Sequence, residues 1–369
     1  MKINIFFFIS RFTFGGAGNA IFTFLNNLDH KKFNIHILFL GNSEYEKILP
    51  NHIKSYKLKI NSKFFKTFFS FFEIRKILLD KSKNCKKNIF ISNIHYSNVL
   101  SVLFLRRLKN LKIILFERTS IKELDIYENI FSYMKNKIIK SLIRITYSRA
   151  DSVLTNSKTL SIELTEFNVN SKVIYSGSIK KLKKLKKLKS NKKRINFNFI
   201  AVGRLTAQKD YITLLKAISL LKHKNYRLSI FGSGELKNEI LKFINENKLN
   251  KYVKLKGHEK DKNKIYKKAN LLIHTAIFEG LPNVIVEAMN YGVPVIAANS
   301  HGGTKEILGS GKYGQLFDPY KHIELAKKIE EFILNPEKLN KKILKSKPIL
   351  KKFTYKNTTK SLEKILLSI

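Results

Sequence analysis

Short apolar runs alternate with longer mixed stretches along the chain, and the alternation forms two separate series. The first series of expected strands covers residues 2–10, 34–40, 88–92, 111–116, 151–156 and 172–175. The second covers residues 197–202, 226–231, 252–255, 271–274, 293–297 and 313–317. Nearly continuous apolar strands that are joined by helices are typical of a parallel sheet covered on both faces. The pattern therefore predicts an α/β protein with two doubly wound, Rossmann-like parallel-sheet domains.

Helices are expected between these strands, at residues 18–28, 65–79, 95–106, 211–221, 236–245 and 261–269. Another expected helix covers residues 351–369, at the C-terminal end of the chain. We expect this last helix to pack back on the N-terminal domain.

One low-complexity segment, residues 180–194, separates the two series of strands. Ten of its fifteen residues are Lys or Arg, and leucine recurs at Leu182, Leu185 and Leu188. The segment is interpreted first as a solvated linker. The alternative is a basic amphipathic hinge that rests on anionic lipid, because three leucines at this spacing share a broad helix face. The predicted domains are therefore residues 1–179 and 195–350, with the C-terminal helix at 351–369.

The composition excludes several classes of protein. Cys85 is the only cysteine, which excludes an internal disulfide and a cysteine-based zinc cluster and favours a reducing, cytoplasmic setting. No apolar run reaches the roughly 18 residues that indicate a membrane-spanning helix. The short run from Ile3 to Ile9 is interpreted as a buried strand rather than a signal peptide.

The charge of the chain is extreme, because 71 basic residues against 27 acidic ones give a net charge of +44. Two explanations stay open, namely attraction to a polyanion and a compositional bias that spreads lysine over every surface. Among polyanions, an anionic membrane surface is favoured over nucleic acid, because no RNA-binding module is recognisable in the sequence.

The strongest chemical signal lies in residues 271–307. The pattern there predicts a strand, a helix with Pro282 in its first turn, and a second strand. Backbone N–H groups at Gly280–Asn283 would form an anion site at the helix start. Glu279 and Glu287 flank this helix start, about 12 Å apart along a helix, and carboxylates accept well from sugar hydroxyls. The stretch therefore predicts a nucleotide-sugar site.

Five motifs in a fixed order give the second half of the chain a family resemblance. They are Gly203-Arg204-Leu205 with Lys209, Phe231-Gly232-Ser233-Gly234, Leu255-Lys256-Gly257-His258, the segment Glu279–Glu287, and Gly302-Gly303-Thr304-Lys305-Glu306. Together they resemble the donor-binding half of retaining glycosyltransferases with the GT-B fold, family four of the sugar transferases (glycosyl transferases group 1). The segment Glu279–Glu287 is similar to the E-x7-E motif of that family. The resemblance implies two Rossmann-like domains that face each other across a cleft.

The resemblance also implies roles for individual residues. Arg204 and Lys209 would stabilise the diphosphate leaving group, for which a guanidinium fork and an ammonium point charge are suited. Glu279 would orient the donor sugar, Glu287 would hold the ribose hydroxyls, and His95 of the N-terminal domain would face the donor sugar. Further donor contacts are implied at Gly15, Gly16, Gly203, Gly232, His258, Gly280, Leu281, Pro282 and Asn283.

No metal and no cofactor are expected at this site. Metal-dependent transferases hold a divalent cation with acidic clusters, and no D-x-D sequence occurs at the predicted cleft. Positive charge from Arg204, Lys209 and the helix start would take the place of a metal in stabilising the developing negative charge.

The expected function is retaining, metal-independent transfer of a sugar from a nucleoside-diphosphate sugar to a hydroxyl acceptor. The expected acceptor is a lipid-linked sugar or a precursor of a surface polysaccharide or lipopolysaccharide, and the expected location is the inner face of the cell membrane, as a peripheral protein. Two alternatives stay open: another GT-B enzyme, such as a sugar-nucleotide epimerase, and a basic nucleic-acid-binding protein.

Overall fold

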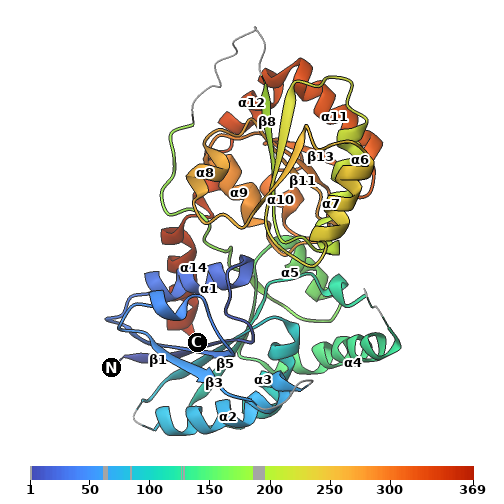
Figure 1. The fold of residues 1–369 in the computed structure, drawn as a ribbon. Coiled ribbons are helices and arrows are strands. Elements are labelled where there is room, and N and C mark those ends of the chain that lie inside the picture. The colour runs from blue at the N-terminus through green and yellow to red at the C-terminus, as the bar shows by residue number, and fades with distance from the viewer. Residues whose placement is uncertain (1, 61–64, 84, 126, 128, 186–195) are drawn as a thin grey trace. The chain divides into compact units, whose positions relative to one another are not determined.

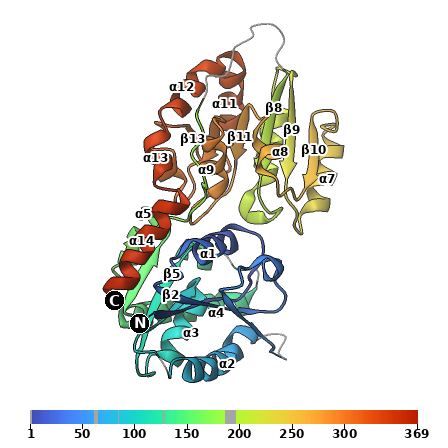
Figure 2. The ribbon, with the colours of Figure 1, turned by 90° about the vertical axis from the view of Figure 1, so that its left-hand side faces the viewer.

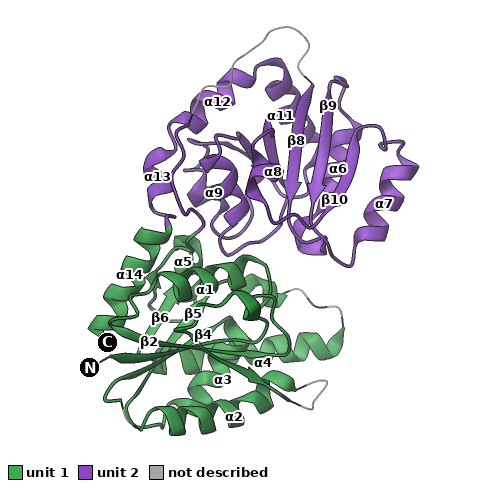
Figure 3. Cartoon of the chain, turned by 60° about the vertical axis from the view of Figure 1, so that its left-hand side comes forward, with its two compact units in different colours: residues 1–177, 355–369 green, residues 178–354 purple. Residues whose placement is uncertain are grey.

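The chain folds into two compact units. The computed structural model describes residues 2–60, 65–83, 85–125, 127, 129–185 and 196–369. One unit consists of Met1–Gly177 together with Tyr355–Ile369, and the other of Ser178–Thr354 (Figure 3). The chain therefore passes from the first unit into the second and returns to the first at its C-terminal end.

A seven-stranded parallel sheet forms the centre of the first unit, in the order β3-β2-β1-β4-β5-β6-β7. Its strands are β1 (Ile3–Ile9), β2 (Phe33–Leu40), β3 (Lys54–Leu58), β4 (Asn88–Asn93), β5 (Leu111–Glu117), β6 (Ser152–Thr155) and β7 (Lys172–Val173). Neighbouring side chains of a strand point to opposite faces of the sheet. In β1, Phe6 and Phe8 join one buried layer, whereas Ile5 and Phe7 join the other. Burial on both faces explains the continuous apolar run.

Helices cover both faces of this sheet (Figure 2). They are α1 (Gly16–Asn27), α2 (Lys66–Lys81), α3 (His95–Leu105), α4 (Ile130–Thr146), α5 (Lys158–Thr165) and α14 (Tyr355–Ser368). The helices α1 and α14 pack together on one face, and α2 to α5 supply the buried layer on the other. The C-terminal helix is held in this unit by Glu363, whose carboxylate accepts a hydrogen bond from the Asp29 N–H at 2.9 Å.

The second unit has a six-stranded parallel sheet in the order β10-β9-β8-β11-β12-β13. The strands β8 and β11 lie at its centre (Figure 1). Its strands are β8 (Phe197–Val202), β9 (Tyr226–Phe231), β10 (Val253–Gly257), β11 (Leu271–His274), β12 (Val295–Ala298) and β13 (Gln315–Phe317). Its helices are α6 (Tyr211–Ser219), α7 (Lys237–Glu246), α8 (Lys262–Tyr266), α9 (Asn283–Asn290), α10 (Thr304–Ile307), α11 (His322–Leu334), α12 (Pro336–Leu344) and α13 (Lys347–Lys351). The largest buried cluster lies between this sheet and α6, α7, α11 and α12.

The predicted fold class, two Rossmann-like units with parallel sheets, is confirmed. Several predicted elements were too long: the helix expected at 261–269 ends at Tyr266, and the strand expected at 172–175 ends at Val173. Other elements were not predicted, among them α11 and α12 in the second unit and β3 and α4 in the first. The edge strand β3 buries only Leu58, and α4 buries only Ile139, Ile143 and Thr146, so neither shows the continuous apolar pattern of a core element.

The basic segment 180–194 lies only partly within the described residues, since 186–195 fall outside them. The described part, residues 180–185, is not helical, so an amphipathic helix is not present there. Its backbone is bound to the end of α9: the Asn290 side chain accepts from the Lys183 N–H at 3.1 Å and donates to the Lys181 carbonyl at 3.2 Å. This part of the segment therefore belongs to the second unit.

Candidate functional site

Polar side chains of the second unit gather in the loop that joins β11 to α9. The backbone of this loop is fixed by the segment after β12, because the Glu279 N–H donates to the His301 carbonyl at 2.8 Å and the Gly303 N–H donates to the Gly280 carbonyl at 2.9 Å. A side chain at Gly302 would not fit, since its Cβ would lie 1.5 Å from the Glu279 carbonyl oxygen, and its φ is +111°. The motif around Gly302 thus holds the Glu279 loop in place.

The helix start that was predicted to bind an anion is present, but α9 begins one residue later than expected. Pro282 is the residue before the helix, with ψ of 90°, rather than part of its first turn, and Asn283 is the first helical residue. No side chain caps this start, and the first turn contains no acidic residue. An uncapped helix start presents N–H groups and the positive end of the helix dipole, which favour an anion.

Lys209 and Glu279, predicted to act at the same diphosphate–sugar junction, are brought together by the structure. Lys209 ends the short turn η4 (Ala207–Lys209) after β8, and its ammonium pairs with the Glu279 carboxylate. The two loops are also joined through their backbones, because the Ile277 N–H donates to the Gln208 carbonyl at 3.0 Å and the Thr275 hydroxyl donates to the Lys209 carbonyl at 2.7 Å.

His274, which the sequence analysis did not single out, also contacts Glu279. Its Nε2 lies 3.4 Å from Glu279 Oε1, and burial lowers the pKa of His274 below its ordinary value. Burial would raise the pKa of Glu279, but the Lys209 ammonium and the His274 ring outweigh it, and the pKa falls to about 2. Glu279 is therefore ionised at neutral pH and acts as a hydrogen-bond acceptor rather than as an acid.

Glu287 lies on α9 and contacts two other residues. Its Oε2 accepts a hydrogen bond from the Tyr266 hydroxyl at 2.9 Å, and its Oε1 lies 2.8 Å from the Lys262 ammonium. Burial raises the pKa of Tyr266 well above its ordinary value, with a further contribution from Glu287. The Glu287 side chain is only 14% exposed, whereas that of Lys262 is 41% exposed. Of the two partners of Glu287, Lys262 is therefore the one that a ligand can replace.

The glycine motifs after β8 and β9 lie against each other. Gly232 has φ of +151°, and a Cβ there would lie 1.8 Å from the Gly203 carbonyl oxygen. The Tyr211 hydroxyl donates to the same carbonyl at 3.1 Å. The two motifs thus form one closely packed backbone surface at the carboxyl ends of neighbouring strands, where doubly wound folds bind ligands.

The remaining residues predicted in this unit are placed on the same edge of the sheet. Arg204 directly follows Gly203 and is exposed, and His258 follows β10 and is also exposed. Gly280 and Leu281 are buried in the loop before α9. The Asn283 side chain accepts a hydrogen bond from the Ser178 hydroxyl at 2.7 Å.

In the first unit, the glycine turn after β1 opens α1 two residues earlier than expected. Gly15 precedes the helix and Gly16 is its first residue. A Cβ at either position would meet nothing within 4 Å, whereas one at Gly18 would lie 2.1 Å from the Thr13 carbonyl oxygen. Gly18 is therefore required by packing, and the surface at Gly15 and Gly16 is open.

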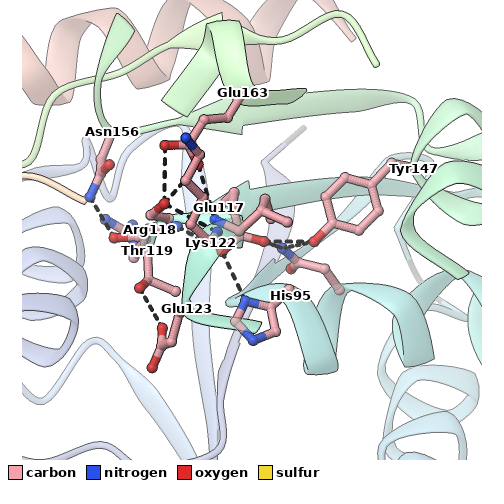
Figure 4. A network of polar contacts seen from close by, with 12 residues as sticks. His95, Glu117, Arg118, Thr119, Lys122, Glu123, Tyr147, Asn156 and Glu163 are labelled. Carbon is pink, nitrogen blue, oxygen red and sulfur yellow. Dashed lines mark hydrogen bonds and ion pairs between the residues drawn. The ribbon is translucent and has the colours of Figure 1, made fainter. Parts of the chain in front are cut away.

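His95 belongs to a buried polar network at the carboxyl ends of β4 and β5 (Figure 4). Glu117, completely buried, accepts hydrogen bonds from the Tyr147 hydroxyl at 2.6 Å and from the Asn98 amide at 3.3 Å. His95 Nδ1 lies 3.8 Å from Glu117 Oε1. Burial would lower the pKa of His95, but Glu117 outweighs it and the pKa is raised. The preceding Ile94 has φ of +74°, which is strained for a β-branched residue.

Arg118, next in sequence, is buried beside this network. Its Nε donates to Asn93 Oδ1 at 2.6 Å, and its guanidinium lies 3.7 Å from the centre of the Phe116 ring. Burial lowers the pKa of Arg118 to about 9, against the opposing effect of Glu117, so the side chain still carries its charge at neutral pH. These contacts of the buried Arg118 side chain hold the backbone directly after β5 in place.

Neither His274 nor Tyr266 was predicted as part of the site. His274 ends an apolar strand and Tyr266 ends a short helix, so each resembles an ordinary core residue in the sequence. The available signal was position, because His274 lies five residues and Tyr266 thirteen residues before Glu279. Among the described residues, no group of three or more His, Cys, Asp or Glu is arranged to hold a metal ion.

Comparisons with known proteins agree with this geometry. Residues 180–347, nearly all of the second unit, match the family model described as glycosyl transferases group 1. The chain is 27% identical over 363 residues to GalNAc-alpha-(1->4)-GalNAc-alpha-(1->3)-diNAcBac-PP-undecaprenol alpha-1,4-N-acetyl-D-galactosaminyltransferase of Campylobacter jejuni, covering 93% of this chain and 92% of that protein.

Solved structures show the same fold over the whole chain. Anabaena Alr3699/HepE in complex with UDP-glucose is similar with a TM-score of 0.80 at 18% identity, and all of both chains is covered. Sucrose-phosphate synthase from Thermosynechococcus elongatus is similar with a TM-score of 0.81 at 16% identity, with 100% of this chain and 99% of that chain covered. Residues 180–347 therefore match the glycosyl transferases group 1 family, and the chain is a glycosyltransferase with the GT-B fold.

Proposed function

We propose that this glycosyltransferase moves a sugar from a nucleoside-diphosphate sugar to a hydroxyl of a lipid-linked saccharide, with retention of anomeric configuration and without a metal. The observation that carries the proposal is the pairing of Lys209 with Glu279 beside the uncapped start of α9. The cation and the helix start suit the diphosphate of a ligand, and the ionised carboxylate suits the sugar hydroxyls of the same ligand.

The proposed chemistry uses these groups in the following way. The bond between the anomeric carbon and the diphosphate oxygen breaks, and the negative charge that develops on the diphosphate is stabilised by Lys209, Arg204 and the N–H groups at the start of α9. A new bond forms from the acceptor hydroxyl oxygen to the same face of the anomeric carbon, and the hydroxyl proton passes to the leaving phosphate. No protein acid is required, in agreement with the lowered pKa of Glu279.

Glu279 and Glu287 have separate roles in this proposal. Glu279 accepts hydrogen bonds from hydroxyls of the donor sugar while Lys209 turns towards the diphosphate. Glu287 accepts from the ribose hydroxyls while it keeps the Tyr266 hydrogen bond and exchanges its half-exposed partner Lys262. In this way the ligand replaces two lysine contacts rather than leaving a buried carboxylate without a partner.

The proposed acceptor and location rest on two further observations. The Campylobacter relative, by its name, acts on an undecaprenol-diphosphate-linked saccharide. The net charge of +44 favours association with an anionic membrane surface, where such an acceptor would lie. No helix among the described residues is long and apolar enough to cross a membrane. We therefore propose a peripheral enzyme at the inner face of the cell membrane.

The test is product analysis with a panel of UDP-sugars, in the presence and absence of a polyprenyl-diphosphate-linked saccharide. A sugar transferred only when the acceptor is present, with the α-configuration of an α-linked donor kept in the product by NMR, is the expected result. Conversion of the nucleotide sugar to an epimer without any acceptor would contradict the proposal, as would an inverted linkage.

A further inference from the structure

The helix α4 of the first unit exposes large apolar side chains along most of its length. Five of them are more than half exposed: Ile130, Phe131, Met134, Ile138 and Ile145, of which Ile130 reaches 73%. Its first nine residues, Ile130 to Ile138, contain no buried side chain. Soluble proteins rarely expose a continuous apolar row of this kind unless it meets a partner.

These side chains lie on one face of the helix. Phe131, Met134, Ile138 and Ile145 are separated by three, four and seven residues, the spacings that place side chains above one another in an α-helix. The opposite face is attached to the core by Ile139 and Ile143. The exposed row, called here the α4 stripe (Ile130, Phe131, Met134, Ile138 and Ile145), is therefore a second apolar face that the fold itself does not cover.

The structure holds this helix firmly although half of it buries nothing. Asn129 and Ser132 form a capping box, in which the Ser132 N–H donates to the Asn129 side chain at 2.9 Å and the Asn129 N–H donates to the Ser132 hydroxyl at 3.2 Å. Figure 1 shows α4 extending outward at the edge of the first unit. A capped helix start stabilises a projecting helix without tertiary packing.

The charge of α4 has a single sign. It contains Lys135, Lys137, Lys140 and Arg144 and no acidic residue. Lys140 pairs with Asp125, and Lys137 lies 5.9 Å from the centre of the Tyr133 ring. An apolar stripe flanked by cations is the pattern of a helix that lies in the interface of an anionic bilayer, with its apolar face at the headgroup–acyl boundary.

We propose that the α4 stripe and its flanking cations form the surface by which the first unit binds an anionic membrane. This inference deepens the proposed function, because it assigns the membrane contact of that enzyme to one helix. A second copy of the chain fits less well, since a twofold contact between two α4 helices would bring Lys135, Lys137 and Arg144 of both copies together without any acidic partner on the helix.

The test compares two sets of apolar substitutions by cosedimentation with vesicles. The α4 variant carries Phe131→Ser, Met134→Ser and Ile138→Ser. The matched control carries Tyr320→Ser, Ile323→Ser and Leu334→Ser in the second unit, where the three side chains are 62%, 57% and 70% exposed. With vesicles of phosphatidylglycerol and phosphatidylcholine, the α4 variant should partition at least about tenfold less than the wild type, equivalent to about 1.4 kcal/mol, and the control should partition like the wild type.

A second pair of variants tests the charge. Lys135→Gln, Lys137→Gln and Arg144→Gln on α4 should reduce partitioning onto the phosphatidylglycerol vesicles and weaken its dependence on salt, because each cation near an anionic surface contributes. Lys327→Gln, Lys338→Gln and Lys341→Gln, three exposed residues of the second unit, remove the same charge elsewhere and should change partitioning less. Equal losses from the two charge variants would assign binding to overall charge and overturn the role of α4.

Two other outcomes would also overturn the inference. One is membrane partitioning of the triple Ser variant on α4 equal to that of the wild type. The other is a wild-type dimer in sedimentation equilibrium that the same substitutions convert to monomer, which would identify a second copy as the occupant. Calorimetric titration of UDP into each variant separates this inference from the proposed function: failure to bind UDP in the wild type counts against the enzyme proposal, whereas the vesicle result tests α4 alone.

Discussion

Each unit carries a glutamate of low exposure at the carboxyl edge of its sheet, Glu117 at the end of β5 and Glu279 in the loop after β11, but different groups bind the two carboxylates. Glu117 receives hydrogen bonds from the Tyr147 hydroxyl and the Asn98 amide, which belong to its own core. Glu279 is paired with Lys209, whose long side chain comes from another loop. Lys209 can turn towards a ligand and leave Glu279 to bind it, whereas the partners of Glu117 are part of the packing that forms the fold.

Replacement of Lys209 by alanine should have the largest effect. The substitution removes the cation that would stabilise the leaving diphosphate, and loss of one such group typically lowers kcat by about 10²- to 10³-fold. The measurement is the initial rate of sugar transfer at saturating donor. Lys216→Ala on α6, an exposed lysine of the same unit, is the control and should keep the wild-type rate. A wild-type rate in the Lys209 variant would show that the ion pair is only structural.

Replacement of Glu287 by alanine should weaken binding of a nucleoside diphosphate. A hydrogen bond to a charged group contributes about 1.5–3 kcal/mol, so the affinity measured by calorimetry should fall by roughly 10- to 100-fold. Glu239→Ala on α7, an exposed glutamate, is the control. Equal affinities in the Glu287 variant and the wild type would remove this residue from the site.

Replacement of Gly302 by alanine should destabilise the second unit. Its Cβ would meet the Glu279 carbonyl oxygen at 1.5 Å, whereas Gly311 has a similar φ of +94° and no atom within 4 Å of its Cβ. Backbone strain of this kind costs about 1–3 kcal/mol. The free energy of unfolding should therefore fall further in Gly302→Ala than in Gly311→Ala, by the cost of the clash. Urea unfolding gives both values. Equal free energies of unfolding for the two variants would mean that the loop moves aside.

The two glutamate sites should respond to pH in opposite directions. The pKa of Glu279 is lowered from 4.5 to about 2, so its ionised form stabilises the fold above pH 4.5, and this contribution disappears as pH falls towards 2. The pKa of His95, beside Glu117, is raised above 6.5, so the contribution of protonated His95 is complete below pH 6.5 and disappears as pH rises past the folded pKa.

Hydrogen exchange of peptides from each unit measures these two contributions. The stability lost in Glu279→Gln should shrink on acidification below pH 4.5. The stability lost in His95→Gln should instead shrink as pH rises above 6.5. Losses that are independent of pH would show that the effects come from packing.

The smallest effect is expected from removal of metal ions. The proposed site uses Lys209 and the start of α9 in place of a cation, so EDTA should leave the transfer rate unchanged. A rate abolished by EDTA and restored by Mg²⁺ or Mn²⁺ would show that the positive charge at the diphosphate comes from a metal instead.

Much of the second unit could be predicted from the sequence because its signals are local. Continuous apolar runs identify strands that are buried on both faces, and the glycines at 203, 232 and 302 mark places where backbones come into contact. The pairing of Lys209 with Glu279 could not be predicted from spacing, because the residues are 70 positions apart and meet only through the order of β8 and β11 in the sheet.

The first unit was harder to predict for the opposite reason. Its polar network joins His95, Glu117 and Tyr147 from three separate elements, and no motif spans them. The helix α4 was missed because its apolar residues occupy two faces, of which only the one with Ile139 and Ile143 meets the core. Apolar residues on two faces do not give the single core-facing stripe by which an amphipathic helix is recognised in a sequence.

The most direct test of the central claim is to locate bound UDP-sugar by hydrogen exchange. The claim is that one ligand contacts the loop after β8, the loop from β11 to α9 and the first turn of α9. The account predicts that UDP-sugar slows exchange in peptides containing Gly203–Lys209 and Glu279–Glu287, and that Lys209→Ala weakens this protection. Binding that leaves both peptides unchanged and protects other parts of the second unit instead would contradict the account.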